Sequence, residues 1–127
     1  MLSTILKEIH KVSTISRIKV EGAKSFVRGS GKSSAQLITL VLDAYDDKPF
    51  MHTIASGLKA KGFVILSGGK AQLPSVKVAK DGRAMLLVRT APDLIQVSLC
   101  NAPDQKDKTF TEEEIAEAHS TLTKLRS

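Results

Sequence analysis

Residues 46–66 constrain the fold more than any other part of the chain. They begin with a polar turn, Asp-Asp-Lys-Pro, and Pro49 suits the first turn of a helix, where no amide hydrogen is required. Apolar residues at helical spacing then predict an amphipathic helix over residues 49–61. Gly62 is typical of a residue that ends a helix, and the apolar run at residues 63–67 predicts a strand directly after it. A short helix that leads straight into a strand indicates a domain in which helices and a sheet pack together.

Helical spacing of apolar residues predicts three more helices. They lie at residues 3–12, 34–45 and 112–125. The last of these has a clear start, because Thr111 and Glu114 have the spacing of a capping box, in which each side chain satisfies a free backbone amide of the first turn. We therefore expect a C-terminal helix over residues 110–126.

Alternation of apolar and polar residues predicts the strands. Residues 14–20 alternate in this way, and so do residues 75–80 and 83–90, which flank the dipeptide Asp81-Gly82. Asp-Gly between two alternating segments is a strong signal for a tight hairpin. A further strand is expected at residues 94–100, so the strands at the end of the chain indicate an antiparallel sheet.

Length and charge favour one basic domain. The 127 residues suit a single domain spanning 1–127, and the formal net charge is +6. The charge is uneven, since residues 1–91 hold fifteen Lys and Arg against six Asp and Glu. A basic surface of this kind suits a polyanion such as nucleic acid. The alternative is a soluble surface that is rich in lysine and binds nothing charged.

The single cysteine and the lengths of the apolar runs indicate the cellular compartment in which the protein is expected. Cys100 has no cysteine to pair with, which excludes an intramolecular disulfide and a thiolate metal site. The N-terminal residues do not read as a signal peptide, and no apolar stretch is as long as a membrane span requires. We therefore expect a cytoplasmic protein without a membrane partner.

The segment Ile-Ala-Ser-Gly-Leu-Lys-Ala-Lys-Gly-Phe-Val, followed by the basic hairpin around Lys80-Asp81-Gly82-Arg83, resembles winged-helix DNA-binding domains. The resemblance covers residues 34–90, where two helices joined by a short turn would form a helix-turn-helix and the hairpin would form the wing. It implies an α+β fold of order α-β-α-α-β-β-β-α, winged-helix-like, with an antiparallel sheet and a C-terminal helix. The long loop at residues 21–33, the long segment at 68–74 and the acidic final helix depart from the minimal module.

In winged-helix proteins the second helix lies in the major groove and the hairpin contacts the neighbouring backbone. Carried over to the matching positions, the resemblance implies that helix and hairpin side chains contact nucleic acid. The expected residues are His52, Thr53, Ser56, Lys59, Lys61, Lys77, Lys80 and Arg83.

The glycine-rich segment from Arg28 to Ser34 adds two basic candidates, Arg28 and Lys32. It lacks the first glycine of a Walker A motif, since Phe26 stands at that position, so we do not expect an ATPase or GTPase. Glycines that precede a helix can still form a nest of backbone amides that holds a phosphate. A flexible surface loop with a good helix cap is the alternative.

No motif points to catalysis, a cofactor or a metal. His10, His52 and His119 are far apart in the sequence and have no partner at metal-ligand spacing. The three acids Glu112, Glu113 and Glu114 fit the positive end of the last helix better than an active site. Aromatic residues are scarce, which disfavours stacking on single-stranded nucleic acid.

These patterns together predict a non-enzymatic nucleic-acid-binding protein, most simply a binder of duplex DNA that acts as a small transcription regulator or accessory factor. A homodimer through the C-terminal helix would make such a binder symmetric. The alternative is a protein-protein interaction module, such as an inhibitor, chaperone or assembly factor, that pairs through its sheet edge or its last helix. A small enzyme acting on a phosphorylated substrate is a third reading, and it lacks an acid/base pair.

Overall fold

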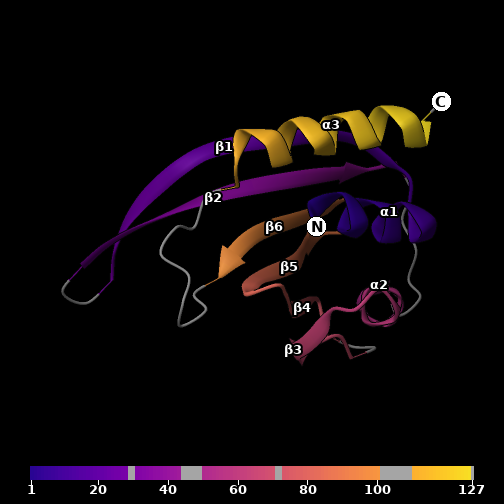
Figure 1. The fold of residues 1–127 in the computed structure, drawn as a ribbon, viewed down its shortest axis with the longest axis horizontal. Helices are drawn as coiled ribbons and strands as arrows, with labels where there is room; N and C mark the ends of the chain where they lie inside the picture. The colour runs from indigo at the N-terminus through magenta and orange to yellow at the C-terminus, as the bar shows by residue number, and fades with distance from the viewer. Residues whose placement is uncertain (29–30, 44–49, 71–72, 101–109, 127) are drawn as a thin grey trace.

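The computed structural model describes residues 1–28, 31–43, 50–70, 73–100 and 110–126, with the side chains of 22–36 and Cys100 outside the description. These residues form three helices and six strands (Figure 1). In chain order they are α1 (Leu2–Val12), β1 (Ile15–Arg28), β2 (Gly31–Leu42), α2 (Phe50–Ala60), β3 (Val64–Gly68), β4 (Ser75–Lys80), β5 (Arg83–Ala91), β6 (Leu94–Cys100) and α3 (Glu112–Arg126).

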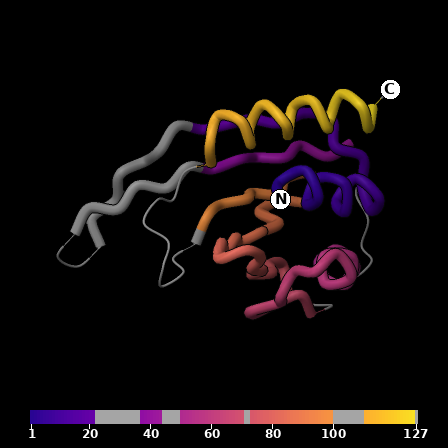
Figure 2. Tube along the Cα trace, viewed as in Figure 1, coloured from indigo at the N-terminus to yellow at the C-terminus, as the bar shows by residue number. Residues whose placement is uncertain are grey.

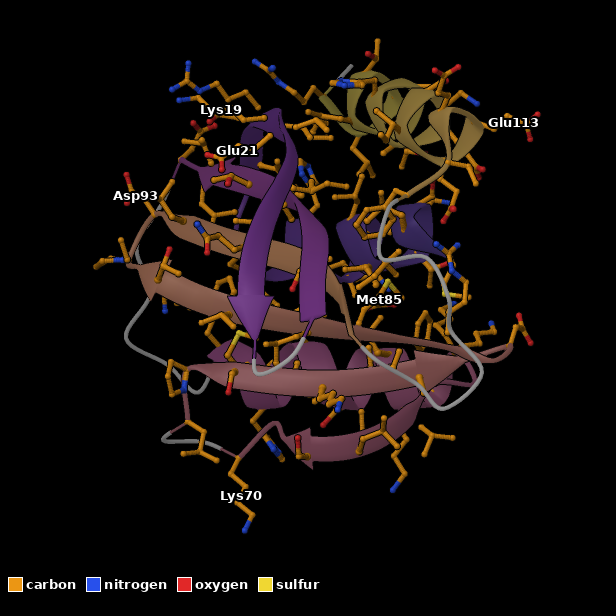
Figure 3. The ribbon with its side chains drawn as sticks, turned by 90° about the vertical axis from the view of Figure 1, so that its left-hand side faces the viewer. Lys19, Glu21, Lys70, Met85, Asp93 and Glu113 are labelled. Carbon is orange, nitrogen blue, oxygen red and sulfur yellow. The ribbon has the colours of Figure 1, made fainter. Side chains whose placement is uncertain are left out.

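The six strands form one antiparallel sheet in the order β1-β2-β6-β5-β4-β3. β3, β4, β5 and β6 follow one another as a meander, and β6 then pairs with β2, so that the first hairpin and the meander join at the middle of the sheet. α1 and α2 lie behind the strands when the sheet faces the viewer (Figure 3). In the view of Figure 2, α1 lies between α3 and α2. One face of the sheet therefore carries the helical layer, and β1 and β3 form its two edges.

Alternation along the strands places apolar side chains under the helices. Ile38, Val97, Leu87 and Val76 are successive cross-strand partners from β2 to β4, and all four are fully or almost fully buried. Side chains of adjacent strands in such a row pack directly against one another. Because successive residues point to opposite faces, this row fixes which face of every strand meets the helices.

The helical layer is held by apolar contacts and one buried polar pair. Leu2, Ile5 and Ile9 of α1 are buried in the core, as is Leu122 of α3. The Thr121 hydroxyl donates a hydrogen bond of 2.9 Å to the hydroxyl oxygen of Ser3, which joins α3 to α1. The apolar side of α3 thus contributes to the core of its own chain.

Several local predictions are confirmed. The predicted helices at 3–12, 49–61 and 112–125 correspond to α1, α2 and α3, and the Asp81-Gly82 hairpin joins β4 to β5. Gly62 has a φ of +93°, and the amides of Gly62 and Phe63 bond to the carbonyls of Lys59 and Leu58, which is the Schellman arrangement at the end of a helix.

The capping box at the start of α3 is also confirmed. The Glu114 amide donates to the Thr111 hydroxyl oxygen at 3.1 Å, and the Thr111 amide donates to Glu114 Oε1 at 3.2 Å. Phe110 is buried just before the cap and Ile115 packs against the same core, so the chain enters α3 at a fixed position.

The predicted loop at 21–33 and helix at 34–45 are wrong. Residues 15–28 and 31–42 form β1 and β2, which pair from Ile15 opposite Leu42 to Arg28 opposite Gly31. The apolar run from Leu37 to Leu42 fits a helical stripe and a strand equally well, and pairing with β6 decides between them. Its residues then alternate between the two faces, with Ile38 and Leu40 in the core.

The predicted winged-helix-like order α-β-α-α-β-β-β-α is therefore wrong as well. A strand, β2, stands where the first helix of a helix-turn-helix was expected, and the described elements follow the order α-β-β-α-β-β-β-β-α. The chain has the mixed helix and sheet content that its sequence predicts, but the sheet is the larger part and α2 packs on it as one of three covering helices.

Candidate nucleic-acid interface

The residues predicted on the second helix share one exposed side of α2. His52, Thr53, Ser56 and Lys59 are all exposed there, while Phe50, Met51, Ile54, Ala55 and Leu58 face the core. His52 also has a structural contact, because its Nδ1 lies 3.1 Å from the carbonyl oxygen of Gly69 and can donate to it when that nitrogen carries the proton. The expected side chains of α2 are thus exposed to solvent. The helix itself packs on the sheet, however, and is not the second helix of a helix-turn-helix.

The residues predicted on the β4–β5 hairpin are separated from one another. Lys77 lies opposite Leu86, on the face of the sheet that points away from the helices. Lys80 turns to the end of α2, where its Nζ donates to the Lys61 carbonyl at 3.0 Å and lies 5.2 Å from the centre of the Phe63 ring. Lys80 therefore acts as part of the helix cap.

Arg83 contacts the start of α3. Its Nη1 donates to Glu114 Oε2 at 2.5 Å, and its guanidinium lies 5.9 Å from the centre of the Phe110 ring. Burial by itself would raise the pKa of Glu114, but the hydrogen bonds from Arg83 and Thr111 and the charge of Arg83 outweigh it and lower that pKa. Arg83 thus helps to hold the C-terminal helix in place.

Arg28 and Lys32 lie at the far end of the first hairpin, where Arg28 is opposite Gly31 and Val27 is opposite Lys32. The predicted phosphate nest needed a helix beginning after the glycines, and the residues from Gly31 onward form a strand instead. The ten predicted residues therefore do not make one surface: the α2 set and Lys77 lie on opposite sides of the sheet, and Arg83 pairs with an acid.

A different group of basic side chains comes together on the exposed surface of the helical layer. Lys61, which follows α2, joins Lys7 and Lys11 of α1 around a hollow of about 330 Å³. Glu8 lines the same hollow but is buried, and its Oε1 accepts a hydrogen bond from Lys11 Nζ at 3.1 Å. The three lysines themselves are exposed, so the hollow presents positive charge to solvent.

The same basic region continues onto the start of β1. Leu125 of α3 lines the hollow, and the next residue, Arg126, donates from Nη1 to the Ser16 carbonyl at 2.6 Å. Arg17 follows at once and is exposed. Figure 1 shows the C-terminal ends of α1 and α3 and the start of β1 on the same side of the molecule. We call this surface the basic end, defined by Lys7, Lys11, Arg17, Lys61 and Arg126.

Sequence reasoning found only one residue of the basic end, Lys61. Lys7 and Lys11 have i, i+4 spacing on the polar side of a predicted helix, which was the available signal. Nothing in the spacing of Arg126 and Ser16, which are far apart in the chain, indicates that they meet. The grouping depends on how α3 packs beside α1.

The described residues give no support for base stacking, metal binding or a membrane-spanning helix. Phe50, Phe63 and Phe110 are buried, so none of these three can stack on an unpaired base. Among the described residues, no three His, Cys, Asp or Glu side chains are grouped as metal ligands would be. Within that same part of the chain, every helix is too short or too polar to cross a bilayer.

A scan against protein-family models, a search of curated proteins and a search of solved structures each found no match for this chain.

Proposed function

We propose that this protein binds duplex DNA without catalysing a reaction, and that it does so through the basic end and the adjoining β1–β2 hairpin. The observation that carries the proposal is the hollow in which Lys61 of one helix end joins Lys7 and Lys11 of another. Lysine side chains grouped in this way neutralise phosphates and release the counterions that surround DNA. Binding of this kind is strong at low salt and has little sequence preference.

The first hairpin supplies a second basic element. Residues 15–42 carry Arg17, Lys19, Lys24, Arg28 and Lys32 and a single acid, Glu21. β2 pairs with β6 over Leu37–Val41, while the β1–β2 pairing continues beyond it to Arg28 and Gly31. Among the described residues, that part of the hairpin is a two-stranded ribbon, and its sequence is basic.

The ribbon favours DNA over RNA. The major groove of B-form DNA is wide enough for a two-stranded ribbon, whereas the major groove of A-form RNA is deep and narrow and excludes side chains. A binder that relies on phosphates and a ribbon suits an accessory or regulatory factor better than a reader of one short sequence. As the compartment we propose the cytoplasm, because the lone cysteine excludes an intramolecular disulfide.

Fluorescence anisotropy with labelled duplexes tests this function. We expect the protein to bind a mixed-sequence DNA duplex at low salt, and to bind an RNA duplex of the same sequence more weakly. Replacement of Lys19, Lys24 and Lys32 by glutamine should weaken DNA binding by roughly tenfold or more and flatten its salt dependence. Absence of DNA binding at low salt, or equal affinity for both duplexes, contradicts the proposal.

A variant with Lys59, Lys70 and Lys77 replaced by glutamine is the matched control. This control also loses three positive charges, but from α2, from the segment after β3 and from β4. The formal net charge therefore falls from +6 to +3 in both variants. If net charge alone attracts DNA, the two variants will weaken binding equally. If the hairpin contacts DNA, the control will stay close to the wild-type affinity.

A further inference from the structure

The edge of the sheet opposite the hairpin ends in a short strand with exposed apolar residues. Among the described residues, β3 is the last strand in the sheet order and pairs with β4 alone. Val64 is 59% exposed and Leu66 is 50% exposed, while Ile65 between them packs against the core. An edge strand of this kind offers backbone amides and carbonyls, together with apolar side chains, to a further strand.

The residues that flank β3 in the sequence carry charge of one sign. Residues 48–80 hold six lysines and no aspartate or glutamate. Lys61 precedes β3, Lys70 follows it, and Lys77 lies opposite Ser67 on the neighbouring strand. In Figure 3 the labelled Lys70 extends away from the lower edge of the sheet, where β3 is the outermost strand. Any strand that pairs with β3 will therefore have positive charge at both ends and on one side.

This charge pattern disfavours a second copy of the chain as the partner. In an antiparallel pair of β3 strands centred on Leu66, Lys61 of each copy would lie next to Lys70 of the other. Like charges at both ends of a strand pair oppose association. The register shift between Ile65 and Ser67 also bends this strand, which makes two identical edges a poor fit.

We propose that β3 binds an extended peptide segment of another protein, one in which apolar residues alternate with acidic residues. The peptide would add a seventh strand to the sheet, with backbone hydrogen bonds along β3, apolar contacts at Val64 and Leu66, and carboxylates near the lysines. β3 lies at the other edge of the sheet from β1. The β3 surface shares Lys61 with the basic end, but the inference does not depend on the proposed DNA binding.

A synthetic peptide tests the inference directly. The probe is a labelled peptide of roughly six residues, the usual length of a strand, in which valine alternates with glutamate. A second peptide replaces each glutamate by lysine. We expect the acidic peptide to bind at least about tenfold more tightly than the basic one and to weaken as salt is added. Amide hydrogen exchange in β3 of the wild-type protein should slow only when the acidic peptide is present.

Two matched variants locate the site. Leu66→Thr keeps a residue that favours strands but removes apolar surface, and we expect it to weaken binding of the acidic peptide by about tenfold. Leu73→Thr makes the same change at an exposed leucine outside the strand and should leave binding unchanged. Circular dichroism confirms that each variant is folded.

Three results would overturn the inference. The first is no binding of the acidic peptide, or equal binding of both peptides. The second is binding that neither slows exchange in β3 nor responds to Leu66→Thr, because the peptide would then be attracted by charge alone. The third is slow exchange, without any peptide, at the β3 amides that do not bond to β4, together with a concentration-dependent dimer, which would make a second copy the occupant.

Discussion

Arg83 Nη1 donates a hydrogen bond of 2.5 Å to Glu114 Oε2, and this contact ties the start of β5 to the start of α3. The same glutamate completes the capping box with Thr111. One side chain therefore fixes both the beginning of the C-terminal helix and its position on the sheet. Because Leu125 and Arg126 at the other end of α3 contribute to the basic end, this contact also bears on the proposed interface.

The Arg83–Glu114 contact predicts a loss of stability in acid. The pKa of Glu114 is lowered in the folded protein, so its contribution is present above the unfolded pKa, near 4.5, and is lost as the pH falls through the lower folded pKa. We expect Glu114→Gln to reduce the free energy of unfolding by about 1 kcal/mol at neutral pH and to have less effect in acid. Urea unfolding at a series of pH values measures this. Glu113→Gln, on the exposed side of the same turn, is the control, and an equal effect of both variants would contradict the prediction.

The capping hydroxyl of Thr111 can be tested separately. Thr111→Ala removes the acceptor of the Glu114 amide and should cost about 1 kcal/mol of the free energy of unfolding. Thr123→Ala is the matched control, since its hydroxyl donates to the His119 carbonyl within the same helix. Thermal unfolding of the two variants should show a lower midpoint for Thr111→Ala alone.

Gly57 lets α2 approach the buried carboxylate of Glu8. A Cβ at this position would lie 2.5 Å from Glu8 Oε2, although alanine is intrinsically better than glycine in a helix by about 1 kcal/mol. We therefore expect Gly57→Ala to stabilise the Glu8→Ala variant but to bring little gain, or a loss, in the wild type. A double-mutant cycle by urea unfolding measures the coupling. Equal effects in the two backgrounds would mean that the carboxylate moves aside freely.

Two glycines with positive φ should respond differently to alanine. At Gly62, with φ of +93°, a Cβ would meet only the end of the Lys80 side chain at 3.7 Å, so the cost is that of the backbone conformation, about 1 kcal/mol. At Gly69, with φ of +72°, a Cβ would also lie 2.9 Å from the Cβ of Ala55 in α2. Gly69→Ala should therefore be the more destabilising of the two by about 1 kcal/mol or more. A smaller loss at Gly69 than at Gly62 would show that α2 can move away from β3.

Elements with their own stop and start signals could be predicted from sequence. Gly62 ends α2 and Thr111 with Glu114 begins α3, because these roles depend on residues that are neighbours in the chain. The turn at Asp81-Gly82 is of the same kind. Local geometry alone favours these structures, so no knowledge of the rest of the fold was needed.

The stretch that carries Leu37, Ile38, Val41 and Leu42 could not be assigned in this way. It has apolar residues at helical spacing and also β-branched residues, which favour a strand, and its partner, β6, comes more than fifty residues later. Sequence reasoning chose a helix there, and the winged-helix-like fold followed from that choice. The basic end could not be predicted for a related reason, since Lys7, Lys11 and Lys61 meet through the packing of α1 beside α2.

The most direct test of the account is the salt dependence of DNA binding when the basic end is neutralised. The variant with Lys7, Lys11 and Lys61 replaced by glutamine is compared with the variant that lacks Lys59, Lys70 and Lys77, which has the same net charge. We predict that the plot of log affinity against log salt loses about 2–3 units of slope in the first variant and little in the second. Equal slopes for the two variants, or a greater loss when Lys59, Lys70 and Lys77 are replaced, would contradict the proposed interface.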